Sequence, residues 1–182
     1  MKQFWLSVRE IGEVVVISLF TVFIIRTYLM QPFLVSGASM EPNFQNGNYL
    51  LIDELSYRFR EPKRGEVVVF RYPGDEKTFY IKRMIGLPGE RVVVRDGIVY
   101  IYNSENPKGL RLDERYIPED IKTTGNVDTS LGVGEYFVMG DNRYYSFDSR
   151  NWGSVSRDEI VGLARLRLLP ISEAKAFEAP QY

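Results

Sequence analysis

The chain has 182 residues, 45% of them hydrophobic, and a formal net charge of −1, which suits one compact domain with a short appendage and argues against a nucleic-acid partner. It contains no cysteine, so disulfides, thiol nucleophiles and thiolate metal sites are excluded. It also contains no histidine, which excludes a Ser-His-Asp triad and the usual zinc sites and leaves carboxylates and lysine as the bases of any hydrolase.

The chain begins with an apolar segment. Residues 14–25 carry no charge, and we predict a transmembrane helix over 11–30 after a cytoplasmic N-terminus at 1–10. A bilayer core of ~30 Å requires roughly 20 helical residues. Reaching that length includes Arg26, whose long side chain would have to extend toward the headgroups.

Two other interpretations of this segment remain open. Basic residues precede the apolar run and the small residues Ser36, Gly37 and Ala38 follow it, as in a cleaved secretion signal. A peripheral or soluble buried helix is the third alternative. If the helix is retained, Lys2 and Arg9 favour a cytoplasmic N-terminus, which puts the rest of the chain outside the cytoplasm.

The rest of the sequence is typical of a mostly β domain, because its apolar runs are short, β-branched and separated by Gly and Pro. Asp96-Gly97 is a preferred two-residue type I′ turn and predicts a hairpin over 91–102. Residues 103–134 are polar and rich in turn formers, which predicts loops within the domain, and 172–182 are expected to form a loosely held tail. The predicted strands are 49–52, 66–72, 79–85, 91–95, 98–102, 136–139 and 160–169.

A first candidate site is the small-residue segment from Ser36 to Asn43, after the apolar helix. Small residues allow a backbone to approach a ligand closely, and Ser39 there can be reached by an extended substrate. Its own N–H, with neighbouring backbone, can form an oxyanion hole. Such a serine is also typical of a plain turn, so local spacing leaves both interpretations open.

A second candidate is Lys82, which interrupts the aromatic and aliphatic run 79–85. Strand alternation puts Tyr80, Lys82 and Met84 on one face. An ammonium held among apolar groups has its pKa lowered from ~10.4, which makes the neutral amine available as a base. The alternative is an edge strand with an outward lysine, which the adjacent Arg83 favours.

A third candidate is the segment 140–153, dense in polar, turn-forming and aromatic residues directly after a predicted strand. Asp148 and Arg150 can form a partly buried ion pair, and the Ser146 hydroxyl can hold an amine in place by a hydrogen bond. A purely structural turn is the alternative.

In this order, the three segments resemble the boxes of the bacterial type I signal peptidase (leader peptidase) family. Ser39-Met40-Glu41-Pro42 is similar to its serine box, 64–70 to the strand that follows, 80–90 to its lysine box, and Gly140-Asp141-Asn142-Arg143 to its fourth box. Each box is weak by itself. Four boxes in order after an apolar helix, in a chain without histidine or cysteine, are specific, and they cover nearly the whole chain.

The resemblance implies a membrane-bound serine endopeptidase with a Ser/Lys dyad, which removes signal peptides through an acyl-enzyme. Ser39 would attack the scissile carbonyl, and Lys82 would accept its proton and later activate water. Ser146 would orient the lysine, with Asp148 and Arg150 as structural support.

The resemblance also implies substrate pockets. Shallow pockets for small residues at positions −1 and −3 of a preprotein would give an Ala-x-Ala preference. The residues expected to line them are Phe33, Val35, Tyr80 and Ile81.

Two positions depart from the family pattern. Asn43 stands where threonine is usual, and Gly37 stands where some members place an oxyanion-hole serine. The expected oxyanion donor is therefore the Ser39 N–H, with the hydroxyl of Ser36, one residue displaced, as a helper.

The family fold implies a mainly β structure with an antiparallel catalytic core over 31–86 and 135–171 and a smaller β insertion over 87–134. No metal or organic cofactor is implied. We expect a single-pass monomer of the inner membrane with its catalytic domain on the extracytoplasmic side, and with preproteins and the lipid bilayer, not nucleic acid, as partners. Exposed apolar residues at 32–34 are expected to rest against the membrane.

Other classes of protein remain as alternatives. One is another Ser-Lys peptidase of the same fold, such as the self-cleaving repressors of the DNA-damage response, which lack a membrane helix. A lysine-type organellar peptidase is a second, whereas eukaryotic-type signal peptidases carry histidine where this chain has Lys82. The last is a catalytically inactive, membrane-anchored β-domain that binds partners.

Overall fold

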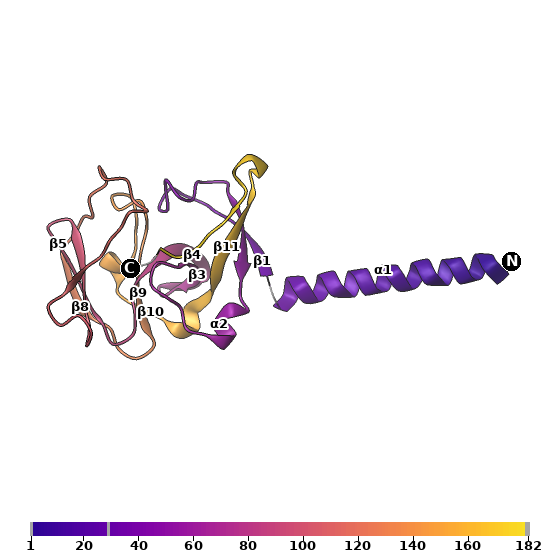
Figure 1. Cartoon of the computed structure of the whole chain (residues 1–182), viewed down its shortest axis with the longest axis horizontal. Helices are drawn as coiled ribbons and strands as arrows, with labels where there is room; N and C mark the ends of the chain where they lie inside the picture. The colour runs from indigo at the N-terminus through magenta and orange to yellow at the C-terminus, as the bar shows by residue number, and fades with distance from the viewer. Residues whose placement is uncertain (1, 29, 181–182) are drawn as a thin grey trace.

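The computed structural model describes residues 2–28 and 30–180 of the chain. Helix α1 (Lys2–Tyr28) extends away from a body of β-strands, with the N-terminus at its far end (Figure 1). The predicted segments 1–10, 11–30 and 172–182 each include positions outside the described residues, namely 1, 29, 181 and 182.

The predicted transmembrane helix is not supported. Within the described ranges, no helix is long and apolar enough to cross a membrane. The helix also differs from the prediction in its bounds, because it begins at Lys2 and because β1 (Met30–Leu34) occupies the end of the predicted segment. Pro32 lies within β1, which is an edge strand, where the missing N–H of proline is tolerated.

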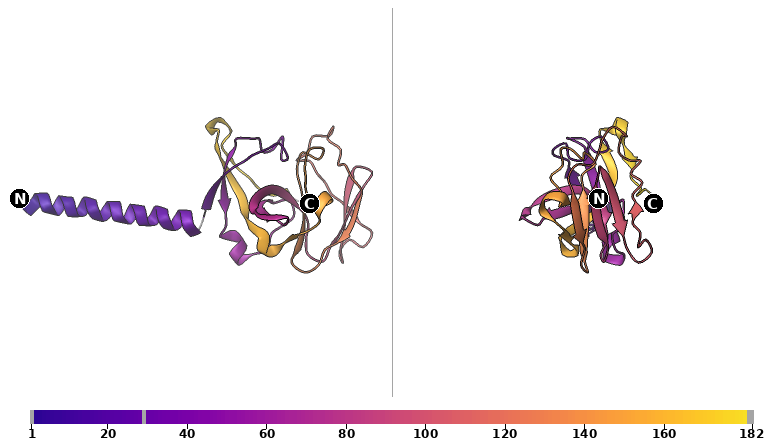
Figure 2. Two further views of the ribbon diagram at one scale, coloured as in Figure 1. Left: turned by 180° about the vertical axis from the view of Figure 1, so that it is seen from behind. Right: turned by 90° about the vertical axis from the view of Figure 1, so that its left-hand side faces the viewer.

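Two antiparallel sheets make up the β body. The larger has the strand order β1-β2-β11-β3-β4-β9-β10, with β12 paired to β11, and the smaller has the order β7-β6-β5-β8. The smaller sheet lies at the end of the body opposite α1, as Figure 1 and the left view of Figure 2 show. The elements are β2 (Tyr49–Asp53), α2 (Ser56–Phe59), β3 (Val67–Tyr72), β4 (Asp75–Gly86), β5 (Arg91–Arg95), β6 (Ile98–Tyr102), β7 (Leu110–Arg111), β8 (Val127–Ser130), β9 (Glu135–Met139), α3 (Ser149–Trp152), β10 (Val155–Ser156), η1 (Arg157–Glu159), β11 (Ile160–Leu169), η2 (Ile171–Glu173) and β12 (Lys175–Ala176).

The mainly β antiparallel prediction is confirmed, and each of the seven predicted runs is a strand. The hairpin is also confirmed, because Arg95 of β5 lies opposite Ile98 of β6. Asp96 and Gly97 between them have φ angles of 53° and 79°, the two positive values that a type I′ turn requires.

Strand β3 is buried on both faces, which explains its uninterrupted apolar sequence. Val67 and Val69 pack into one hydrophobic cluster with Met40, whereas Val68 and Phe70 pack into another. The central strands of the larger sheet therefore lie between two parts of the core.

Strand β9 joins the two sheets. Tyr136 and Val138 pack with β3, whereas Phe137 and Met139 pack with the strands of the smaller sheet. All four strands of that smaller sheet fall inside the segment 87–134. The segment therefore shares a core with the rest of the body instead of folding on a core of its own.

The described part of the predicted tail is mostly exposed, but it contacts the larger sheet. Strand β12 pairs with β11, and the Phe177 N–H donates to the Arg165 carbonyl over 2.8 Å. The Phe177 ring lies 4.4 Å from the Phe44 ring, centroid to centroid. The Phe177 ring and the pairing of β12 thus attach this segment to the larger sheet.

Candidate active site

Ser39 lies in a loop between β1 and β2 that is closed by backbone hydrogen bonds. Val35 N–H donates to the Asn48 carbonyl and Gly47 N–H to the Val35 carbonyl, each over 2.9 Å. Met40, directly after the serine, is buried in the core. Ser39 is therefore fixed between a hydrogen-bonded loop base and a buried side chain, and its N–H makes no hydrogen bond to any described residue.

Lys82 projects from β4 to the serine. Its Nζ donates to Ser39 Oγ over 2.7 Å and to the Ile81 carbonyl over 3.1 Å. It also lies 5.2 Å from the centroid of the Tyr80 ring, which strand alternation had put on the same face. The residue is only 4% exposed, so the alternative of an outward lysine is wrong.

The pKa of Lys82 is lowered to about 8, chiefly because burial disfavours the charged ammonium. The carboxylates of Asp148 and Asp141 act in the opposite direction, and Arg150 adds to the lowering. At that pKa roughly one lysine in ten is neutral at pH 7, against roughly one in 2,500 for an unshifted side chain.

Arg83, which had favoured the outward lysine, points to the opposite side of β4 and is buried. Its Nε and Nη2 donate to the two carboxylate oxygens of Asp141 over 2.7 and 2.6 Å. Asn43, the residue in the usual threonine position, also donates to Asp141 over 2.9 Å. Sequence reasoning missed this cluster because its three members lie far apart along the chain.

The segment after β9 is tied directly to the serine. Asn142 donates from its backbone N–H to the Ser39 carbonyl and from its side chain to the Ala38 carbonyl, both over 3.1 Å. A Cβ at Gly140 would lie 2.3 Å from the Ser39 carbonyl oxygen, so this close approach requires glycine. The role of Asn142 was not predicted, although its box was recognised.

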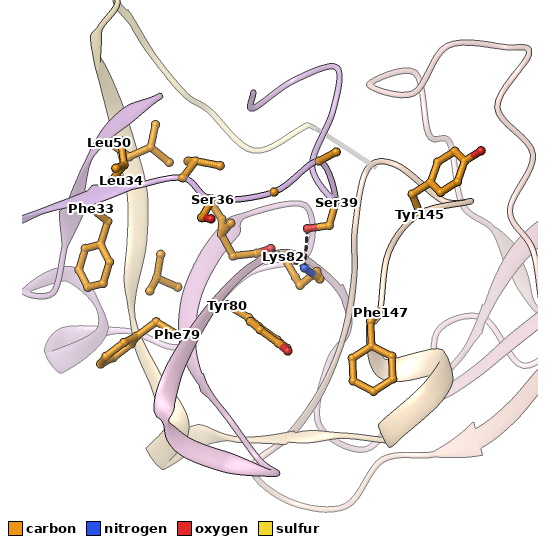
Figure 3. Close-up of a pocket in the computed structure, with 15 residues that line it drawn as sticks. Phe33, Leu34, Ser36, Ser39, Leu50, Phe79, Tyr80, Lys82, Tyr145 and Phe147 are labelled. Atoms are coloured by element: carbon orange, nitrogen blue, oxygen red, sulfur yellow. Dashed lines mark hydrogen bonds between the residues drawn. The ribbon is translucent and has the colours of Figure 1, made fainter. Parts of the chain in front are cut away.

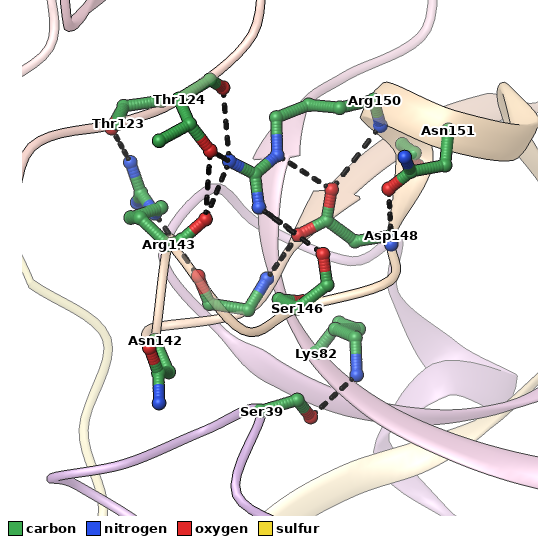
Figure 4. Close-up of polar contacts among 12 residues, drawn as sticks. Ser39, Lys82, Thr123, Thr124, Asn142, Arg143, Ser146, Asp148, Arg150 and Asn151 are labelled. Carbon is green, nitrogen blue, oxygen red and sulfur yellow. Dashed lines mark hydrogen bonds and ion pairs between the residues drawn. The ribbon is translucent and has the colours of Figure 1, made fainter.

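Asp148 and Arg150 form the predicted ion pair (Figure 4), with Arg150 Nη2 donating to Asp148 over 2.7 Å and both side chains almost inaccessible to solvent. Asp148 also accepts from the Gly140 N–H over 2.9 Å and caps α3. Burial alone would raise the pKa of Asp148, but its hydrogen bonds to Arg150 and the guanidinium charge hold it below its usual value.

Arg143 is fully buried beneath the same segment. It donates to Glu114 over 3.0 Å and to the Thr123 hydroxyl over 2.6 Å, both in the segment between β7 and β8. The smaller sheet's connecting loop is thereby attached to the site.

Ser146, predicted to orient the lysine, lies beside Lys82 (Figure 4). Its Oγ is buried, and the hydrogen bonds of Lys82 Nζ to described residues go to Ser39 and to the Ile81 carbonyl instead. The structure therefore brings Ser146 to the site without the expected hydrogen bond to Nζ, and its role stays a prediction.

A cleft of about 330 Å³ opens over the Ser39 and Lys82 pair (Figure 3), and we call it the Ser39 cleft. Its lining includes Ser36 and all four residues predicted to contact substrate. Gly37, with a φ of 97°, adopts a backbone conformation that disfavours a side chain there. The described residues contain no group of carboxylates able to hold a metal ion.

A serine hydroxyl that is hydrogen-bonded to a buried amine in a cleft is an arrangement that serine hydrolases can use. Comparison with known proteins narrows that class. The family model for "Signal peptidase, peptidase S26" matches residues 8–169. The chain is 39% identical over 169 residues to a probable signal peptidase I-2 of Synechocystis sp., which covers 89% of this chain and 73% of that protein.

Two further proteins that the chain matches are also named signal peptidase I. Signal peptidase I T of Bacillus subtilis is 35% identical over 177 residues, covering 91% of this chain and 88% of that protein. A crystal structure of a signal peptidase I from Enterococcus faecalis V583 is 31% identical, with a TM-score of 0.48 over 57% of this chain and 97% of that one. The chain therefore belongs to the signal peptidase family, peptidase S26. Its enzymatic activity is that of a signal peptidase I, the cleavage of signal peptides by a serine peptidase.

Proposed function

We propose that the chain removes signal peptides from exported preproteins by cleavage after small residues, with Ser39 as nucleophile and Lys82 as general base. The observation that carries the proposal is the 2.7 Å contact between Lys82 Nζ and Ser39 Oγ, made by a lysine that is 4% exposed. A buried amine beside a serine hydroxyl can act as a base only if its pKa is lowered, and burial supplies that lowering.

Acylation begins when the neutral Lys82 amine accepts the proton of Ser39 Oγ and the oxygen attacks the carbonyl carbon of the residue at −1. The developing oxyanion accepts a hydrogen bond from the Ser39 N–H, with Ser36 as a second donor. Lys82, now an ammonium, gives its proton to the departing amine as the C–N bond breaks. The mature protein leaves, and the signal peptide remains as an ester of Ser39.

Deacylation repeats these steps with water. Lys82, neutral again, accepts a proton from a water molecule whose oxygen attacks the ester carbonyl. The ammonium then returns the proton to Ser39 Oγ as the ester bond breaks. The ion pair of Asp148 and Arg150 and the Asn142 contacts support this chemistry by fixing the segment against which Ser39 rests.

The preference for small residues is argued from the shape of an extended substrate. Side chains alternate along an extended chain, so the residues at −1 and −3 point to the same side. The Ser39 cleft is lined by Phe33, Val35, Tyr80 and Ile81, and we place the two pockets, shallow ones, among these side chains. We propose that these pockets accept Ala-x-Ala.

We further propose that α1 attaches the enzyme to the cytoplasmic membrane, with the β body on the extracytoplasmic side. Nine apolar side chains of α1 are 49–66% exposed, and Leu34 of β1 is exposed at the base of the helix. Such a surface is costly in water and favourable in lipid. The nine are Ile11, Val14, Val15, Val16, Ile17, Leu19, Phe20, Val22 and Phe23.

Cleavage of a preprotein bearing Ala-x-Ala by the purified full chain in detergent tests the dyad. We expect Ser39→Ala and Lys82→Ala each to lower the cleavage rate by about 10³-fold or more, because neither partner is effective alone. An acylating inhibitor should label wild-type Ser39 and fail to label the Ser39→Ala variant. Full activity in either variant would contradict the dyad. An intact wild type that is not labelled would also contradict it and would favour an inactive β-domain.

A further inference from the structure

Two aromatic side chains of the Ser39 cleft have no part in the mechanism above. Tyr145 is 81% exposed and Phe147 is 52% exposed, and both line the cleft with Ser39 and Lys82. In the described part of the chain, the Tyr145 ring makes no ring or cation contact. A large aromatic ring left in solvent at the wall of an active site is unexplained by folding alone.

These two rings lie across the dyad from the proposed pockets (Figure 3). Phe33 and Phe79 stand on one side of the Ser39 and Lys82 pair, and Tyr145 and Phe147 stand on the other. An extended peptide whose −1 carbonyl reaches Ser39 Oγ and whose −3 residue lies toward Phe33 continues past Ser39. The peptide residues after the scissile bond would therefore lie on the side of Tyr145 and Phe147.

The segment that carries the rings is fixed at both ends. Asn142, before Tyr145, bonds to the Ser39 and Ala38 carbonyls, and Asp148, after Phe147, is buried in its pair with Arg150. The Tyr145 N–H also donates to the Asn142 carbonyl over 3.2 Å. The backbone that carries the rings is therefore held near the nucleophile, so this segment need not become ordered when a ligand binds.

The chemistry of the cleft points to an apolar ligand. Lys82 is the single charged side chain among the described residues that line it, and Lys82 is engaged with Ser39. A side chain that rests on these rings gains contact in proportion to its apolar surface, so an apolar side chain gains more than a polar one of the same size.

We propose that Tyr145 and Phe147 form a subsite for the first residue of the mature protein, position +1, and that this subsite favours an apolar side chain there. The inference rests on the proposed function. It makes the enzyme selective on both sides of the scissile bond, with small residues before it and an apolar residue after it.

The test compares two Ala-x-Ala peptides that differ only at +1, where leucine or the similarly sized asparagine is placed. We expect wild-type kcat/KM to favour leucine by about tenfold, and Tyr145→Ala to reduce that ratio to about twofold or less. Tyr145→Phe, which keeps the ring, should retain the ratio. Tyr144→Ala is the matched control, because Tyr144 is 53% exposed beside Tyr145 and does not line the cleft.

Discrimination at −1, measured with alanine against leucine at that position, should be the same in all four proteins. A +1 ratio unchanged in Tyr145→Ala, an equal loss in Tyr144→Ala, or a parallel loss of −1 discrimination would overturn the inference. Cleavage of these peptides with an unchanged ratio overturns the subsite alone. Failure of the wild type to cleave any of them overturns the proposed function, and the subsite with it.

Discussion

Lys82 is the proposed base, and its burial also destabilises the folded protein. Because its pKa in the folded protein is lowered from 10.5 to about 8, the folded state binds fewer protons than the unfolded state between those values. The buried ammonium therefore lowers the free energy of unfolding most below pH 8. This loss disappears as pH rises from 8 toward 10.5. The shift corresponds to about 3 kcal/mol at 1.36 kcal/mol per pKa unit.

Lys82→Met should accordingly stabilise the protein at pH 7, by about 2–3 kcal/mol in the free energy of unfolding, because an apolar side chain of similar length removes the buried charge. Urea denaturation of both proteins from pH 7 to 10.5 measures the difference, which should shrink as pH rises. If Lys82→Met were no more stable than the wild type at pH 7, or if the difference in stability were constant across this range, the pKa of Lys82 would not be lowered.

Residues that sequence reasoning found differ in kind from those it missed. Ser39 and Lys82 each lie in a box of consecutive residues, so each could be recognised from a short stretch of sequence. Arg83 and Asp141 are 58 positions apart, and only the pairing of β4 with β9 brings them together. A buried ion pair of that kind leaves no local signal in the sequence.

Among the secondary elements, the C-terminal strand β12 and the residue after it depart most from expectation. Phe177→Ala should lower the free energy of unfolding by about 1–3 kcal/mol, because it removes the ring that packs on Phe44. Ile171→Ala, a change at an exposed side chain of the same region, should have little effect. Urea denaturation measures the free energy of unfolding of both variants. Equal losses in the two would mean that Phe177 is not packed on the sheet.

The elements that the sequence predicted well are those with a strong local pattern. The type I′ turn at Asp96-Gly97 and the two-faced apolar run of β3 each determine their own structure. Strand β1 was missed because its apolar residues continue those of α1, and β12 because a strand of two residues carries no alternating pattern. Pairing with the neighbouring strand β2 or β11, not local propensity, forms both of them.

At the scale of the whole molecule, the exposed apolar surface of α1 is the feature that a water-soluble body would not retain. The full chain should float with lipid vesicles in a density gradient, and Val16→Asp with Phe20→Asp should abolish this by putting charge into the apolar surface. Val133→Asp, at a fully exposed site before β9, is the control and should float as the wild type does. Flotation that survives both α1 changes would contradict attachment through α1.

The central claim is that a buried, neutral Lys82 activates Ser39, and the dependence of kcat/KM on pH tests it most directly. For an Ala-x-Ala peptide, kcat/KM should rise roughly tenfold per pH unit below 8 and level off by about pH 9, because it follows the neutral fraction of a lysine with a pKa of about 8. A rate that still rises tenfold per unit between pH 9 and 10, or one that does not change between pH 6 and 9, would contradict Lys82 as the base.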